Sequence, residues 1–172
     1  MKKTLIIVDV QNDFLKGGAL AVDTADENFV KEVDAIRDKF DQVIFTADAH
    51  PENHISFSDF PPHCVKGTFG GEIALTIKNG DILIEKGKEK GIEEFSPFVG
   101  GRDIDKVLGD EVYVLGLAGD YCVKAALEDL LKYHPEKKYF AIKDLIYSVD
   151  KSKYGPVDHF DGKVTFINSN EI

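Results

Sequence analysis

Six short runs of apolar, β-forming residues are spaced along this chain, with helical or loop segments between them. The first run, residues 5–10, is apolar except for Asp9, as is typical of a strand buried in a parallel sheet. The other runs cover residues 42–47, 81–85, 111–117, 139–142 and 164–167. Strands that alternate with helices favour an α/β domain with right-handed crossovers. We therefore expect residues 1–172 to form one doubly wound domain, with a mostly parallel six-stranded sheet and helices on both faces.

Two of the intervening segments have helical patterns. Asp26 can cap a helix whose apolar face is formed by Val30, Val33, Ile36 and Phe40. A second helix is expected over residues 121–133. Residues 48–80 are predicted to form a loop, and a loop of this length is usually functional.

The size and charge of the chain restrict its partners. A chain of 172 residues with 43% hydrophobic residues can form a core without disulfides or structural metals. Its net charge of −10 argues against nucleic acid or an anionic membrane and is compatible with a small neutral or cationic substrate. The first apolar run reaches Asp9 too early for a signal peptide and is too short to span a bilayer. We expect a cytoplasmic protein with reduced cysteines.

Polar residues follow four of the predicted strands. Asp9, Asp48 and Lys86 come at the ends of the first three, and Cys122 follows the fourth by a short turn. Ligands of open α/β sheets bind beyond the carboxyl ends of the strands. We therefore expect these four residues to meet at one edge of the sheet.

Cys122 is the candidate nucleophile, because a helix N-terminus and the ammonium of Lys86 would both favour its thiolate. Asp9 is the candidate base that takes the thiol proton and returns it to a leaving amine. The alternatives are a buried inert cysteine, a capping aspartate and a solvated lysine. For Cys64, in the long loop, the buried inert cysteine is the interpretation we favour.

Three of the five histidines, His50, His54 and His63, lie close to Asp48 in the sequence. Imidazole and carboxylate ligands suit a divalent transition metal, and the absence of nearby paired cysteines favours an open site over a structural zinc finger. Zinc is the first expectation, with iron or manganese as alternatives. The alternative for the histidines is a set of solvated loop residues. His134 and His159 are expected at the surface.

The motifs that contain these residues occur together in a known order. They are Val8-Asp9-Val10-Gln11-Asn12-Asp13-Phe14, Asp48-Ala49-His50 with His54, Pro61-Pro62-His63-Cys64-Val65-Lys66-Gly67-Thr68, Glu85-Lys86-Gly87, and Gly116-Leu117-Ala118-Gly119-Asp120-Tyr121-Cys122-Val123. With them the chain resembles the nicotinamidase/pyrazinamidase branch of the isochorismatase-like cysteine hydrolases. The resemblance extends to about Leu131.

The resemblance implies roles for individual residues. Asp9 would be the proton shuttle, Lys86 the stabilising cation and Cys122 the nucleophile. A cis peptide would join Leu117 to Ala118, and the backbone N–H groups of Ala118 and Cys122 would form an oxyanion hole. The metal ligands would be Asp48, His50, His54 and His63. The aromatic residues that contact the substrate would be Phe14 and Phe60, with Phe95 in the pocket wall.

The chain departs from the family pattern at two places. Gly119 stands where threonine is common, and Glu94-Phe95-Ser96-Pro97-Phe98 replaces the usual tyrosine–serine–glycine pattern. These departures leave the triad and the metal ligands intact and concern the pocket wall.

The implied activity is hydrolysis of nicotinamide to nicotinate and ammonia through a thioester, in NAD salvage, with pyrazinamide as a second substrate. Another amidase of the same fold, acting on a carbamoyl or ureido group, would not need the metal ligands, nor would an isochorismate-type vinyl-ether hydrolase. A binding protein that lost the chemistry and a purely structural metal protein are further alternatives. The sequence leaves the oligomeric state open, a homo-oligomer included.

Overall fold

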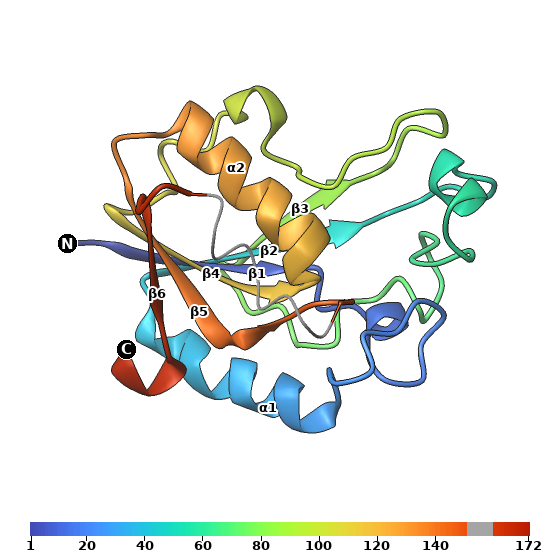
Figure 1. The fold of residues 1–172 in the computed structure, drawn as a ribbon, viewed down its shortest axis with the longest axis horizontal. Coiled ribbons are helices and arrows are strands. Elements are labelled where there is room, and N and C mark those ends of the chain that lie inside the picture. The colour runs from blue at the N-terminus through green and yellow to red at the C-terminus, as the bar shows by residue number, and fades with distance from the viewer. Residues whose placement is uncertain (151–159) are drawn as a thin grey trace.

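The computed structural model describes residues 1–150 and 160–172, which form one six-stranded sheet between two helices (Figure 1). All neighbouring strands are parallel, in the order β3-β2-β1-β4-β5-β6. The strands are β1 (Lys3–Val8), β2 (Gln42–Asp48), β3 (Ile82–Lys86), β4 (Glu111–Leu117), β5 (Lys138–Tyr147) and β6 (Val164–Ile167). The predicted α/β class and parallel sheet are therefore confirmed.

The largest difference from the predicted strands is at β5. We expected this strand to end at residue 142, but it continues through Lys143 and Asp144 to Tyr147. Both charged side chains are exposed, and the register with β4 shifts between Val114 and Gly116. A bulge of this kind lets a strand carry consecutive charges on the solvent side without burying either. The apolar pattern alone could not show it.

The two longest helices cover opposite faces of the sheet, α1 (Glu27–Ile36) on one and α2 (Lys124–Tyr133) on the other (Figure 1). Asp26 caps α1 as predicted, because its side chain accepts hydrogen bonds from the N–H groups of Asn28 and Phe29. The helix ends at Ile36, so the prediction that Phe40 belongs to its apolar face is wrong. Phe40 lies beyond a single 3₁₀ turn, and its ring contacts Tyr113 edge-on.

Shorter helical turns occur in the connections. Single 3₁₀ turns are formed by Asn12–Phe14, Arg37–Lys39, Ile55–Ser58, Val99–Gly101 and Ser169–Glu171. A π-helical turn, Gly119–Val123, leads directly from the end of β4 into α2. The predicted helix over residues 121–133 is therefore confirmed, but its first turn is wider than an α-helix. Cys122 lies in that wider turn.

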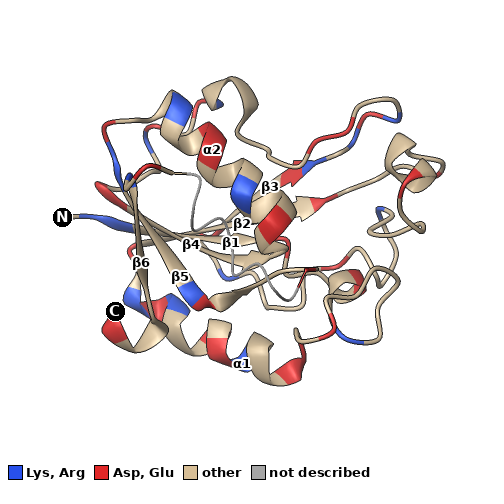
Figure 2. Ribbon diagram, in the orientation of Figure 1, with Lys and Arg blue, Asp and Glu red and all other residues tan. Residues whose placement is uncertain are grey.

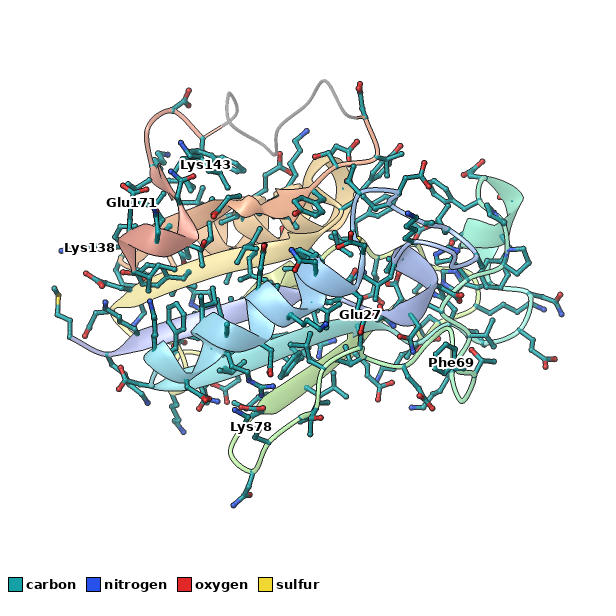
Figure 3. All side chains as sticks on the ribbon, turned by 90° about the horizontal axis from the view of Figure 1, so that it is seen from below. Glu27, Phe69, Lys78, Lys138, Lys143 and Glu171 are labelled. Atoms are coloured by element: carbon teal, nitrogen blue, oxygen red, sulfur yellow. The ribbon has the colours of Figure 1, made fainter. Side chains whose placement is uncertain are left out.

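The fold directs the polar strand ends to one edge. Between β1 and β4 the chain changes direction across the sheet, and crevices at such switch points bind ligands. The loops that follow β2 and β3 gather at this end, while both termini lie at the other end (Figure 1). Figure 3 shows the same polarity: Phe69 lies among the loops, and Lys138, Lys143 and Glu171 lie at the opposite end.

The core lies between the sheet and the two helices. Leu5, Ile6, Ile7 and Val8 of β1 are fully buried. Charged side chains are spread over the helices and loops, with acidic residues in the majority (Figure 2). No helix among the described residues is both long and apolar enough to span a bilayer.

Candidate active site and metal centre

The structure brings Asp9, Lys86 and Cys122 together at the carboxyl edge of the sheet. Nζ of Lys86 lies 2.8 Å from Oδ2 of Asp9 and 3.5 Å from Sγ of Cys122. All three side chains are buried. A nucleophile, a candidate base and a cation therefore meet in one place, as their positions at strand ends predicted.

Local backbone geometry aims these side chains. Asp9 has a left-handed φ of 48° directly after β1, and the Thr46 hydroxyl donates a 2.7 Å hydrogen bond to Oδ1 of Asp9. Gly116 has a φ of 127°, and a Cβ there would clash with the carbonyl oxygen of Val8, so only glycine fits where β4 approaches β1. The predicted cis peptide between Leu117 and Ala118 is present and precedes the turn that holds Cys122.

Burial determines the charge state of Cys122 in this cluster. It raises the pKa of the Cys122 thiol well above its usual value, and the carboxylates of Asp9 and Asp48 add to the shift, while Lys86 lowers the pKa. Lys86 therefore favours the thiolate as predicted, but burial outweighs its effect. Burial also raises the pKa of Asp9. The pKa of Lys86 is raised despite burial, because Asp48 and Asp9 stabilise its charge. The resting cluster holds a thiol, with an acceptor carboxylate beside an ammonium.

Asp48, His50 and His63 form a candidate site for a divalent metal. One donor atom from each lies within 4.8 Å of the others, and all three residues are buried. Nδ1 of His50 bonds the Gly87 carbonyl at 2.8 Å, and Nδ1 of His63 bonds the Pro61 carbonyl at 2.8 Å. Each Nε2 then faces Oδ2 of Asp48, at 3.5 and 3.9 Å. Metal-binding histidines are usually fixed by a second hydrogen bond in this way, so the residues fit a metal ion.

The structure does not bring His54, the expected fourth ligand, into this donor set. Its ring stacks on His50 with centroids 4.0 Å apart. However, Nε2 of His54 bonds the carbonyl of Ile92 at 2.9 Å, and Nδ1 accepts a 3.2 Å hydrogen bond from the N–H of Ser56. Both ring nitrogens are occupied by the backbone, so His54 supports the ring of His50 in this arrangement.

Asp48 connects the metal donors to the triad. Its Oδ1 lies 2.5 Å from Nζ of Lys86, while Oδ2 faces the two imidazoles. Although burial opposes it, Lys86 and His50 hold the pKa of Asp48 well below its usual value. Burial lowers the pKa of His63, and the carboxylates of Asp48 and Glu93 oppose that shift.

Gln11 fixes the backbone of Asp48, a role that the sequence analysis did not assign. Its side-chain amide donates to the carbonyl of Asp48 and accepts from the N–H of the same residue, both at 2.9 Å. Gln11 is fully buried, and its two hydrogen bonds to the N–H and C=O groups of Asp48 fix the backbone of that residue. Gln11 lies two residues after Asp9 in the motif that follows the first strand, and this position could have indicated a role in the site.

A cavity of about 190 Å³ opens onto both groups of residues, since Cys122, Asp48 and His63 all line it. Drug-sized ligands occupy pockets of about 300–1,000 Å³, so this one suits a molecule of a single small ring. The three predicted aromatic residues, Phe14, Phe60 and Phe95, line it as well. Ala118, expected in the oxyanion hole, is also part of its wall.

Three polar lining residues were not assigned to the site from the sequence. Ser56 is buried, and its hydroxyl has no hydrogen-bond partner among the described residues, so it is free to bond a ligand. Tyr121 contacts the rings of Phe60 and Phe95 at the cavity wall. Glu93 contributes a carboxylate. Ser56 and Glu93 lie in loops without a periodic pattern, and Tyr121 lies in the quoted motif directly before Cys122, which was the available signal for it.

Asp120, two residues before Cys122, ties the nucleophile turn to the end of β5. Its two carboxylate oxygens accept hydrogen bonds of 3.0 and 3.1 Å from the N–H groups of Val149 and Asp150. Val149 lines the cavity. The Asp120 side chain thus links the turn that contains Cys122 to the part of the cavity wall that Val149 forms.

Cys64, His134 and His159 were expected to lie outside the site. Cys64 is buried and its burial raises its thiol pKa, in agreement with an inert cysteine. His134 was expected at the surface, but it is buried: its Nε2 bonds the carbonyl of Gly101, and its Nδ1 lies 2.7 Å from Asp105. It joins the end of α2 to a neighbouring loop. His159 lies outside the described residues.

Comparisons with known proteins agree with this geometry. The Isochorismatase domain model matches residues 3–144. A nicotinamidase of Acinetobacter baylyi is 35% identical over 150 residues, which cover 69% of this chain and 70% of the relative. The zinc complex of a pyrazinamidase from Pyrococcus horikoshii has a TM-score of 0.80 at 28% identity, covering 98% of this chain and 99% of the other. An L. infantum protein in complex with nicotinate has a TM-score of 0.82 at 28% identity, covering 98% and 93%.

Proposed function

This chain belongs to the isochorismatase domain family, and from that premise we propose that it is a nicotinamidase. It would hydrolyse nicotinamide to nicotinate and ammonia, and pyrazinamide to pyrazinoate. The observation that carries the proposal is one small aromatic cavity that contains the thiol of Cys122 and two of the three metal donors. Relatives named nicotinamidase and a solved relative in complex with nicotinate support it.

The metal donors favour this activity over the alternative of a carbamoyl or ureido amidase. That reaction requires the acid, the cation and the thiol alone. Here Asp48, His50 and His63 are buried, and backbone carbonyls orient both imidazoles, which a site without a ligand would not require. Burying polar side chains lowers the stability of the folded protein unless hydrogen bonds, a paired charge or a bound metal compensate for the lost contact with water.

The reaction would proceed through a thioester on Cys122. Asp9 accepts the thiol proton as the sulfur attacks the amide carbon, and Lys86 keeps the carboxylate in place. The backbone N–H groups of Ala118 and Cys122 stabilise the oxyanion, each donor contributing about 10²–10³ in rate. Asp9 then protonates the amide nitrogen, which leaves as ammonia when the C–N bond breaks. It next takes a proton from water as the water oxygen attacks the thioester. The C–S bond then breaks, and Asp9 returns this proton to the sulfur as the acid is released.

Phe14, Phe60 and Phe95 would hold the ring of the substrate. Three aromatic side chains in a cavity of this size exclude water and orient a flat heterocycle. The metal, bound by Asp48, His50 and His63 and taken to be zinc, supplies a Lewis acid that can bind a ring nitrogen or a water molecule. The zinc complex of the P. horikoshii relative supports that choice of metal, with iron or manganese as alternatives.

We infer further properties from the same resemblance and from composition. The protein would act in the cytoplasm in NAD salvage, on a small-molecule amide, without a nucleic-acid or membrane partner. Its net charge of −10 supports the absence of polyanionic partners. A homo-oligomer is compatible with everything described, and sedimentation analysis decides the oligomeric state.

The test is ammonia release from nicotinamide and pyrazinamide by the purified protein, with elemental analysis of the same sample. Cys122→Ala should remove activity and leave the bound metal unchanged. Cys64→Ala is the matched control, because Cys64 is buried outside the cavity and should leave the activity in place. A fully active Cys122→Ala protein, or a wild-type protein inactive on both amides, would contradict the proposal.

A further inference from the structure

Glu93 places an acidic side chain on the wall of the substrate cavity. Among the described residues that line this cavity, Asp48 and Glu93 have carboxylate side chains, and none is a lysine or arginine. Asp48 is neutralised by its 2.5 Å contact with Lys86. Glu93 forms no salt bridge with any described residue, although Lys88 and Lys90 belong to the same loop. Glu93 therefore adds a negative charge to the cavity wall that no described lysine or arginine pairs with.

The surroundings allow this charge to act on a ligand. The cavity wall is mainly aromatic and aliphatic, with Phe60, Phe95 and Tyr121 among the residues that line it. Charges interact more strongly across such a medium than through water. The cavity has a volume of about 190 Å³, so a ligand that reaches Cys122 also lies in the space that Glu93 helps to enclose. Glu93 is exposed on its outer side, so salt will weaken its effect.

The reaction changes the charge of the molecule in this cavity. An amide is neutral, whereas the acid formed from it has a pKa of about 4 and is an anion at neutral pH. Lys86 lies 3.5 Å from the sulfur of Cys122, but it already pairs with Asp9 and Asp48. Among the described residues that line the cavity, no lysine or arginine offsets the carboxylate of Glu93. The metal that Asp48, His50 and His63 would hold attracts an anion equally with or without Glu93, so the repulsion from Glu93 acts in addition to it.

We propose that Glu93 is a specificity-determining residue that shifts the preference of the cavity toward the neutral amide and away from its anionic product. This inference rests on the proposed amide hydrolysis. By repelling the carboxylate, Glu93 accelerates product release and keeps the product from occupying the site. The same repulsion excludes other small aromatic acids from the cavity.

The experiment compares Glu93→Gln with the wild-type protein. The inhibition constant for nicotinate, divided by the KM for nicotinamide, should fall about three- to tenfold in the variant, as expected for removing one partly screened charge at this range. The difference should shrink as the salt concentration rises. Glu94→Gln is the matched control, because Glu94 is adjacent in the chain but does not line the cavity, and its ratio should equal that of wild type.

Binding to Cys122→Ala separates this inference from the proposed reaction. The dissociation constants of benzoate and benzamide, measured by calorimetry, give the same comparison without turnover. Glu93→Gln in this background should tighten benzoate binding and leave the benzamide constant nearly as it was. Equal changes for acid and amide, no change for either, or the same change in Glu94→Gln would overturn the role of Glu93. A lack of ammonia release from nicotinamide would instead overturn the proposed function, whatever the binding ratio.

Discussion

The Thr46 hydroxyl donates a 2.7 Å hydrogen bond to Oδ1 of Asp9, and this bond leaves Oδ2 to face Lys86 at 2.8 Å. The two oxygens of one carboxylate are thus held by different partners from neighbouring strands. Oδ2 forms an ion pair with Lys86, whose Nζ also lies 3.5 Å from the sulfur of Cys122, so Oδ2 is the oxygen placed to exchange a proton with the thiol. The base of the proposed reaction is oriented by a residue that never touches the substrate.

Thr46→Val should lower kcat about ten- to a hundredfold, because a hydrogen bond to a charged group is lost while the volume is kept. The bond stabilises the ionised form, so its loss raises the pKa of Asp9 further. The acidic limb of the pH–rate profile should therefore move to higher pH. Thr46→Ser keeps the hydroxyl and should retain both the rate and the limb; a Thr46→Val profile that coincides with wild type would show that the bond does not tune Asp9.

The thiol of Cys122 should react slowly with iodoacetamide below pH 9, because burial and the nearby carboxylates raise its pKa. A raised pKa means that the thiolate forms only at higher pH, so the rate should still be rising above pH 9. Asp9→Asn removes one of the carboxylates and should shift the curve to lower pH. Lys86→Met removes the opposing cation and should shift it to higher pH. The measurement is mass spectrometry in a Cys64→Ala background; opposite shifts for these variants would reverse the assigned roles.

Gly87→Ala should reduce metal affinity about ten- to a hundredfold, the usual effect of disturbing a residue that orients a ligand. Gly87 has a φ of 63°, and a Cβ there would clash with the ring of His50. The bound metal can be measured by chelator competition, and circular dichroism reports whether the fold is kept. Gly91→Ala is the control in the same loop, since a Cβ there meets nothing within 4 Å. Equal metal binding by both variants would mean that the contact with Gly87 does not orient the His50 ring.

His54→Gln should keep about one metal per chain, whereas His63→Gln should lose it. Both nitrogens of His54 bond the backbone, while Nε2 of His63 faces Asp48. Elemental analysis after gel filtration distinguishes the two variants. Loss of metal from His54→Gln as complete as from His63→Gln would restore the four-ligand set that the resemblance implies.

The sequence predicted the parts of the site that depend on topology. Asp9, Asp48 and Lys86 end neighbouring parallel strands, whose carboxyl ends must meet. It could not predict the orientation of the His54 ring, because that depends on the carbonyl of Ile92, 38 residues away in another loop. The charge state of Cys122 likewise depends on burial, which outweighs the helix start and the ammonium that the pattern shows.

The parts of the fold that differed have a similar cause. Phe40 continues the helical spacing of α1, but its aromatic contact with Tyr113 lies outside the helix. Lys143 and Asp144 interrupt the apolar pattern of β5, and a shifted register accommodates them. In each case a contact with a distant element outweighs a local pattern. Glu93, in the segment next to the family departures, illustrates the same point within the cavity.

Every neighbouring pair of strands in this sheet runs in the same direction, so none of the pairs can close through a tight hairpin. The reactive centre is therefore absent from every partly synthesised chain that stops before β4. The acid, the amine and the imidazoles all leave the ribosome well ahead of the sulfur. During translation, a complete catalytic centre would arise only when the last of these distant segments docks. The appearance of enzymatic activity would therefore report the final stage of folding.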